Sequence, residues 1–197
     1  PLLLRAQLTS DCDGEHVSAR VVEVEAYAGE GKDPASHAHR GRTARNASMF
    51  ERAGTAYVYF TYGLHWCLNV AVGSDGEGSA VLLRAAAIVD GVPVARRRRA
   101  TASGRTRPDR DLARGPARLC QALGVTGAQD GLDMLDPTSP LRLVLADEPV
   151  AAGDVARGPR VGVRQAADRP WRFWLDGCDA VSAYRGVVGP RRTEGGR

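Results

Sequence analysis

Apolar and polar side chains alternate along residues 17–27, and this period of two predicts a long β-strand. Val22 and Val24 fall on one face of that strand, whereas Glu23 and Glu25 fall on the other. The strand therefore carries an apolar face suited to a core and an acidic face on the opposite side.

A second pattern predicts a β-hairpin. Residues 56–62 and 64–72 are both rich in aromatic and β-branched side chains, which favour strands. Gly63 separates them and can adopt the positive φ that a tight turn requires. We therefore expect a hairpin with its tip at Tyr62 and Gly63.

The rest of the chain predicts shorter elements of both kinds. A glycine–proline pair marks the start of one helix, because the first turn of a helix tolerates proline. We expect strands over residues 80–87, 141–145, 160–163 and 171–175, helices over residues 94–102 and 117–123, and a polar loop over residues 30–48. Strands outnumber helices and hairpins dominate, so the predicted class is α+β with a mostly antiparallel sheet.

The length fits one domain. At about 150 residues per domain, a chain of 197 residues is expected to form a single domain over residues 1–197. The first residue is Pro1 rather than methionine, which suggests a trimmed or truncated N-terminus. Residues 187–197 are rich in glycine and arginine, and we expect them to form a disordered tail.

Cysteine spacing and hydropathy indicate a cytoplasmic protein. The four cysteines show neither a C-x-x-C pair nor the spacing of a zinc or disulfide framework, so we interpret them as reduced thiols. The best apolar stretch, residues 80–89, is interrupted by Arg84 and is shorter than the roughly 20 residues that a membrane span needs. The N-terminus also lacks the pattern of a signal peptide.

The charge is unusual in kind rather than in amount. There are 27 basic and 23 acidic residues, and Lys32 is the single lysine, so the basic residues are almost all arginines. Guanidinium groups bind phosphates bidentately, which favours a polyanionic partner such as nucleic acid. An arginine-rich composition also results from a GC-rich genome, and composition alone supports both interpretations equally.

Glu25 and Tyr27 are candidates for chemistry because they lie two residues apart at the end of a strand and project from one face. A carboxylate there, near arginines and a histidine, can act as a general base for water. Taken alone, the strand pattern favours a surface glutamate. Tyr62 is a second candidate, because an aromatic side chain at a hairpin tip has little core to pack into and can wedge between bases.

Other motifs give weaker signals. His37 and His39 have strand spacing but no matching third ligand nearby, so we expect no metal and favour a hydrogen-bonding role for His37. The run of arginines at residues 96–99 is typical of a solvated helix face from which at least one side chain can reach phosphate. The motifs of P-loop, dinucleotide-binding and α/β-hydrolase proteins are absent from the sequence.

Taken together and in order, eight segments resemble the alkyladenine/3-methyladenine DNA glycosylase family, also called methylpurine-DNA glycosylases. They include V-E-A-Y, D-P-A-S-H, R-G-R-T-A-R-N and Y-V-Y-F-T-Y-G-L-H-W-C-L-N, and they lie at residues 24–27, 33–37, 40–46, 49–50, 57–69, 81–85, 115–123 and 160–163. This resemblance implies a compact α+β domain with a curved, mostly antiparallel sheet, surrounding helices and a protruding hairpin. It also implies hydrolysis of the N-glycosidic bond of a damaged purine flipped out of double-stranded DNA.

The resemblance also implies roles for eight residues and no cofactor. It makes Glu25 the base that activates water, with Arg84 and the main chain of Val161 holding that water; Tyr27, His37 and Tyr59 line the base pocket, Asn69 guards its entrance and Tyr62 fills the gap in the DNA. We expect a monomer that excises alkylated or deaminated purines. Pocket shape decides among 3-methyladenine, 7-methylguanine, hypoxanthine and ethenoadenine, so the lesion stays open.

The single lysine predicts a monofunctional enzyme that uses water. Glycosylases that also nick the strand need an activated amine nucleophile, whereas Lys32 lies in a glycine-flanked loop and Pro1 precedes leucines rather than an acid. Two other classes remain as alternatives. A non-catalytic nucleic-acid-binding module would keep Tyr62 and the arginines without using Glu25, and a small-molecule hydrolase would not need the tip tyrosine.

Overall fold

One antiparallel sheet organises the protein. The computed structural model describes residues 2–100, 107–184 and 186, and in that part of the chain eight strands form a single sheet. Their order is β3-β4-β5-β2-β1-β6, while β8 pairs with both β2 and β7. The strands are β1 (Gln7–Ser10), β2 (Val17–Tyr27), β3 (Ala56–Thr61), β4 (His65–Val72), β5 (Ser79–Asp90), β6 (Leu141–Val144), β7 (Val155–Gly158) and β8 (Arg172–Leu175). The expected α+β class and antiparallel sheet are confirmed.

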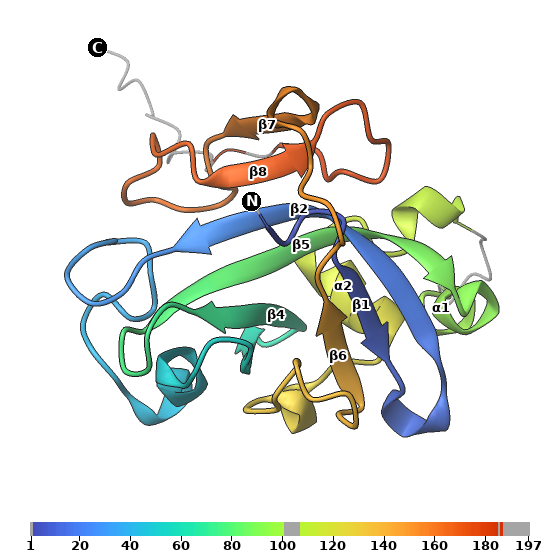
Figure 1. Cartoon of the computed structure of the whole chain (residues 1–197), viewed down its shortest axis with the longest axis horizontal. Coiled ribbons are helices and arrows are strands. Elements are labelled where there is room, and N and C mark those ends of the chain that lie inside the picture. The colour runs from blue at the N-terminus through green and yellow to red at the C-terminus, as the bar shows by residue number, and fades with distance from the viewer. Residues whose placement is uncertain (1, 101–106, 185, 187–197) are drawn as a thin grey trace, which may run out of the picture.

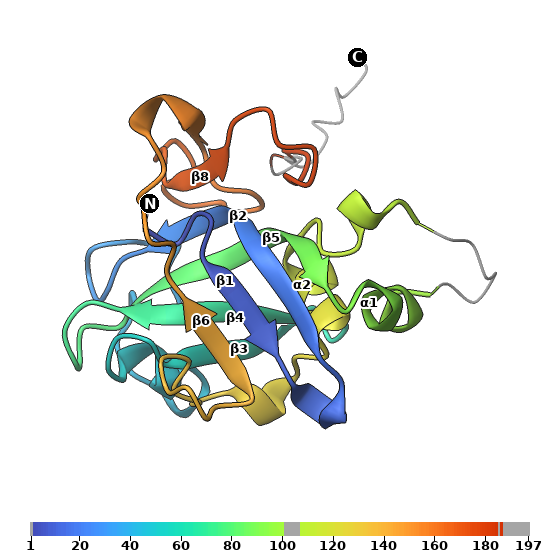
Figure 2. The ribbon, with the colours of Figure 1, turned by 45° about the vertical axis from the view of Figure 1, so that its right-hand side comes forward.

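β2 lies at the centre of this arrangement because it pairs with three strands. β5 runs along one edge, and the other edge is shared between β1, which pairs with residues 17–20, and β8, which pairs with residues 23–25. Register shifts interrupt the β2–β5 pairing around Glu23, and such bulges bend a strand and increase its twist. Figures 1 and 2 show β7 and β8 as a small layer set against β2.

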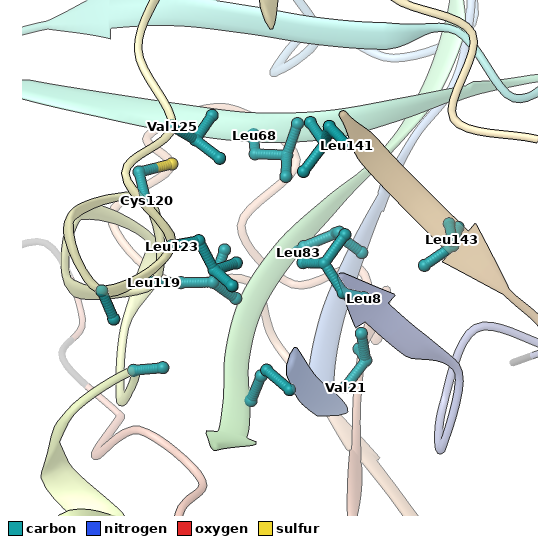
Figure 3. Close-up of a cluster of buried hydrophobic side chains, with 14 of the residues drawn as sticks. Leu8, Val21, Leu68, Leu83, Leu119, Cys120, Leu123, Val125, Leu141 and Leu143 are labelled. Atoms are coloured by element: carbon teal, nitrogen blue, oxygen red, sulfur yellow. The ribbon is translucent and has the colours of Figure 1, made fainter. Parts of the chain in front are cut away.

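In the described ranges, two short α-helices and several 3₁₀ turns surround the sheet. The helices are α1 (Val92–Arg98) and α2 (Pro116–Leu123), and the 3₁₀ turns are Cys12–Gly14, Ala44–Phe50, Asp109–Asp111, Gly127–Gln129 and Ala152–Asp154. Leu119, Cys120 and Leu123 of α2 pack against leucines of the sheet in the main core (Figure 3). Within the described residues, no helix has the length and apolar character required to cross a bilayer.

The hairpin prediction is confirmed. β3 and β4 pair from Ala56 opposite Val70 to Thr61 opposite His65. Tyr62 and Gly63 form the tip with φ of 53° and 64°, and the N–H of Leu64 donates to the carbonyl of Thr61 at 3.1 Å. Two central residues with positive φ define a type I′ turn, whose twist matches that of the strands.

Most of the other expected elements are present with shifted ends, and one is wrong. Strand 17–27 is confirmed, and strands 80–87, 141–145 and 171–175 correspond to β5, β6 and β8. Helix 117–123 corresponds to α2. Helix 94–102 corresponds to α1, which starts two residues earlier and ends at Arg98. The last two residues expected in that helix, Pro1 and the expected tail at 187–197 lie outside the described part of the chain. The loop at 30–48 contains one 3₁₀ turn at its end. β1 and β7 were not predicted.

The strand expected at residues 160–163 is a loop instead. The Arg160 side chain is fully buried in an ion pair with Asp33, and Gly162 has a φ of 74°, far from the extended backbone of a regular strand. The N–H of Val161 donates to the carboxylate of Glu25 rather than to a neighbouring strand. Side-chain pairing with distant residues thus overrides the alternating pattern.

Candidate active site

A cavity of about 540 Å³ opens between the concave part of the sheet and two loops. Strands β2, β3, β4 and β5 supply part of its wall. The rest comes from the loops at residues 34–37 and 161–165, the 3₁₀ turn Ala44–Phe50, the hairpin tip and the start of α2. All eight residues singled out from the sequence line it: Glu25, Tyr27, His37, Tyr59, Tyr62, Asn69, Arg84 and Val161. The fold therefore brings together residues that are up to 136 positions apart in the chain.

Glu25 is a carboxylate with no exposed surface, and both its oxygens are held. Oε1 accepts a hydrogen bond from the N–H of Val161 at 2.6 Å, and Oε2 accepts one from the hydroxyl of Tyr27 at 2.8 Å. A guanidinium nitrogen of Arg84, Nη1, lies 3.4 Å from Oε1. Each of these contacts favours the ionised carboxylate, which otherwise would be costly to bury.

Arg84 is shared between two carboxylates. Its Nε donates to Glu23 at 3.0 Å while its Nη1 faces Glu25, and 8% of the Arg84 side chain is exposed. Burial alone would lower the pKa of Arg84, but the charges of Glu25 and Glu23 raise it above its usual value. Arg84 is therefore a permanent cation at the buried end of the cavity.

Tyr27 forms one wall of the cavity, and Arg160 packs against its ring. Burial and the charge of Glu25 raise the pKa of its hydroxyl, so the hydroxyl keeps its proton and remains a donor. The guanidinium of Arg160 lies 4.6 Å from the ring centre of Tyr27 and binds Asp33 bidentately at 2.5 and 2.9 Å. This buried pair ties the loop that carries His37 to the segment that carries Val161.

Three aromatic rings that pack against one another form a second wall. The ring of His37 lies edge-on to Tyr59, with centres 4.6 Å apart, and its Nδ1 lies 2.8 Å from the hydroxyl of Tyr57. Tyr57 and Tyr59 are neighbours on one face of β3, with ring centres 5.5 Å apart. Partial burial, together with the charge of Arg45, lowers the pKa of His37, so the imidazole is neutral at pH 7.

Asn69 and Tyr62 occupy contrasting positions along the cavity. Asn69 pairs with Tyr57 in the hairpin register and its amide donates to the carbonyl of Tyr57 at 3.0 Å, which leaves it buried in the wall. Tyr62 stands at the rim on the hairpin tip with 87% of its surface exposed. The cavity thus has a fixed, closed end at Glu25 and an exposed aromatic side chain at its mouth.

Three features of the site escaped sequence reasoning. Glu23 is as buried as Glu25, and their shared strand parity was a usable signal for it. Tyr57 lines the cavity, and its parity with Tyr59 indicated the same face. The Asp33–Arg160 pair had no signal in the sequence, because nothing local predicts that a loop aspartate and a distant arginine become buried together.

Two weaker sequence signals, the His37–His39 pair and the arginine run at residues 96–99, can be compared with the structure. Among the described residues, no three His, Cys, Asp or Glu side chains gather as metal ligands would. Each arginine at residues 96–99 has a partner within the protein: Arg96 binds Asp109, Arg97 binds Glu15, Arg98 donates to the carbonyls of Cys12 and Ala122, and Arg99 donates to Leu112 and Gln121. The run thus joins α1 to its surroundings.

Comparison with known proteins matches this chain to glycosylases. The methylpurine-DNA glycosylase family matches residues 1–179. A protein of Nocardia farcinica is 52% identical over 189 residues, which cover 94% of this chain and 87% of the relative. One of Leifsonia xyli is 53% identical over 188 residues (94% and 86%), and one of Mycobacterium tuberculosis H37Rv is 53% identical over 176 residues (87% and 83%). All three carry the provisional name 3-methyladenine DNA glycosylase. The chain therefore belongs to the methylpurine-DNA glycosylase family and is a hydrolytic DNA N-glycosylase.

Proposed function

We propose that this enzyme excises alkylated or deaminated purines from double-stranded DNA by flipping the damaged base into the cavity and hydrolysing its N-glycosidic bond with a water activated by Glu25. The observation that carries the proposal is the fully buried Glu25 carboxylate at the closed end of an aromatic-walled cavity. A base inside the duplex stack is out of reach, so extrusion must precede any attack on its sugar.

The contacts of Glu25 support its role as the general base. The N–H of Val161 and the guanidinium of Arg84 lie against Oε1, and a water placed there would be oriented by both groups and would give its proton to the carboxylate. The same carboxylate would stabilise the positive charge that develops on the sugar in the transition state.

The aromatic walls support recognition of a flipped purine. Tyr27 and Tyr59 offer faces on which a base can stack, worth about 1–3 kcal/mol per stacked base. Alkylation at N3 or N7 places a positive charge on the purine, which strengthens its attraction to tyrosine rings and makes it a good leaving group. The names of the relatives support 3-methyladenine as one such substrate.

Lys32 supports hydrolysis without strand cleavage. Its amine pairs with Glu77 at 3.3 Å, 65% of its side chain is exposed, and it lies outside the set of described residues that line the cavity. An exposed amine that pairs with a carboxylate lacks the desolvated or cationic surroundings that activate a lysine to form a Schiff base. We infer a monofunctional glycosylase that acts as a monomer and requires no cofactor.

The direct test is release of free base from a duplex that carries one alkylated purine. Glu25→Gln should abolish release while leaving affinity for lesion DNA within about tenfold, because the amide keeps the shape of the side chain but cannot accept the proton. Glu15→Gln, which removes a carboxylate that pairs with Arg97 on the surface, is the matched control and should release base normally. A near-normal single-turnover rate for Glu25→Gln would show that Glu25 is not the base.

A further inference from the structure

Glu23 is a second buried carboxylate, and the proposed reaction does not use it. It lies two residues before Glu25 on the same strand face, has no exposed surface and lies behind the described cavity lining. Its oxygens accept four short hydrogen bonds: from Arg84 Nε at 3.0 Å, Arg172 Nε at 2.6 Å, Ser182 N at 2.8 Å and Ser182 Oγ at 2.9 Å. So complete a set of donors keeps Glu23 ionised, and the hydrogen bonds and the charge of Arg84 overcome burial and lower its pKa.

Glu23 determines where the guanidinium of Arg84 lies. A guanidinium is a planar, rigid fork, so fixing one nitrogen fixes the direction of the others. Glu23 holds Nε at 3.0 Å, and Nη1 consequently faces Oε1 of Glu25 at 3.4 Å. The shorter contact is the one with Glu23, so Arg84 is anchored by Glu23 from behind the cavity lining while its Nη1 faces the candidate base.

The charges of this cluster balance. Glu23 and Glu25 contribute two negative charges, and Arg84 and Arg172 contribute two positive charges. If Glu23 were neutral, Glu25 would face an excess positive charge, and a carboxylate beside an undivided cation is a weaker base. Glu23 therefore acts on Glu25 through Arg84.

We propose that Glu23 is a positioning residue that shares the charge of Arg84 and thereby keeps Glu25 basic enough to take a proton from water. This inference rests on the proposed role of Glu25. Two of the four donors that hold Glu23 come from Ser182, which follows the residues matched by the family, 1–179. Arg172 of β8 also donates to the carbonyl of Ser182 at 2.9 Å, which binds this segment to the cluster.

The other groups around Glu25 do not change this balance. Burial raises the pKa of the Tyr27 hydroxyl and of the Cys67 thiol, so both face Glu25 in neutral form from β2 and β4. Arg160, in the loop before Val161, is neutralised by Asp33. Arg164 also lines the cavity, but among the described residues Arg84 of β5 is the cation within ion-pair distance of Glu25, and Glu23 of β2 and Arg172 of β8 lie behind it.

The test is the pH dependence of single-turnover base release. Removing the negative charge with Glu23→Gln should make Glu25 easier to ionise. The acid limb of the pH–rate profile, where the rate falls as Glu25 is protonated, should therefore move to lower pH by about one unit. The plateau rate should fall about three- to tenfold, because the weaker base accepts a proton less readily. Affinity for lesion DNA should stay unchanged, because Glu23 does not belong to the described residues that line the cavity.

Two further variants separate charge from architecture. Arg172→Gln removes a positive charge that partly neutralises Glu23, so its acid limb should move in the opposite direction, to higher pH. Ser182→Ala removes one donor to Glu23 and a 3.5 Å contact to Nη2 of Arg84 but leaves all charges in place. The acid limb of its pH profile should coincide with that of the native enzyme. If Glu23→Gln folds poorly, the Arg172→Gln shift still tests the inference.

The outcomes distinguish this inference from the proposed function. Absence of base release by the native enzyme, or normal release by Glu25→Gln, would refute the proposed function. Normal release by the native enzyme, loss of release in Glu25→Gln and unmoved acid limbs in Glu23→Gln and Arg172→Gln would refute the role of Glu23 alone. A fall in thermal stability without any shift in pH dependence would make Glu23 a purely structural anchor.

Discussion

Tyr62 occupies a backbone conformation that suits it poorly. Its φ of 53° places it in the left-handed region at the first central position of a type I′ turn, directly before Gly63. Asparagine–glycine is the favoured pair for such turns, and other L-residues in this region cost about 1 kcal/mol or more. Because 87% of Tyr62 is exposed, packing offsets little of that cost. We infer that the side chain is kept there for a contact made with DNA.

Replacing Tyr62 with asparagine should therefore stabilise the protein and impair base flipping. Relief of the strained turn should raise the free energy of unfolding by about 1 kcal/mol, which for a domain of this size raises Tm by about 2–4 °C. Loss of the wedge should return the flipping equilibrium toward the stacked base, and a loss of about 2 kcal/mol corresponds to a roughly 30-fold slower single-turnover rate. The deficit should be largest for lesions that still pair well and smallest at mismatches, where extrusion is already easy.

The assay combines a denaturation midpoint with the fluorescence of a base analogue placed at the lesion. Tyr62→Phe keeps the ring and should flip DNA almost as well as the native protein, while it retains the strained backbone. A lower Tm for Tyr62→Asn together with unchanged flipping would mean that Tyr62 is ordinary packing, and the wedge hypothesis would be wrong.

Three other predictions address partner, loop and pocket. The logarithm of the affinity for undamaged duplex should fall linearly with the logarithm of salt concentration, by about 0.9 per phosphate contact, and a flat response in a binding titration would contradict a DNA partner. Asp33→Asn should cost about 3–5 kcal/mol in a denaturation experiment at pH 7, because Arg160 is left buried without its partner. The Arg160 contact outweighs burial and lowers the pKa of Asp33 in the folded protein, so its stabilisation is present above pH of about 4 and is lost as pH falls further; the variant should lack this loss. An NMR titration should place the midpoint of His37 below 6.5, and a higher value would contradict the burial of its ring.

The predictable part of the fold is the part encoded by neighbouring residues. Strand 17–27 and the hairpin were predicted because alternation and a turn glycine are local signals. β1 and β7 are only four residues long, so a period of two has little room to stand out. Residues 160–163 alternate like a strand, but a contact between Arg160 and Asp33, 127 positions apart, sets their structure.

The residues of the site were predictable from the sequence, but their burial was not. The eight residues indicated by the family resemblance line one cavity, whereas strand patterning alone favoured a surface position for Glu25. The pattern correctly placed Glu23 and Glu25 together on the polar face of β2, but it contained no information about what covers that face. Arg172 of β8 and the loop around Val161 cover it, and both come from the last quarter of the chain.

The covering of this face explains how one strand can hold two ionised carboxylates away from water. In a simple half-buried sheet, Glu23 and Glu25 would both be solvated, and their surroundings would differ little. Here the covering elements bring their own donors, so each carboxylate stays charged through hydrogen bonds rather than through water. Of the two, Glu25 lines the cavity, and Glu23 makes the shorter contact with Arg84. Two residues with the same chemistry on the same face thus become a candidate base and its support, because their surroundings differ.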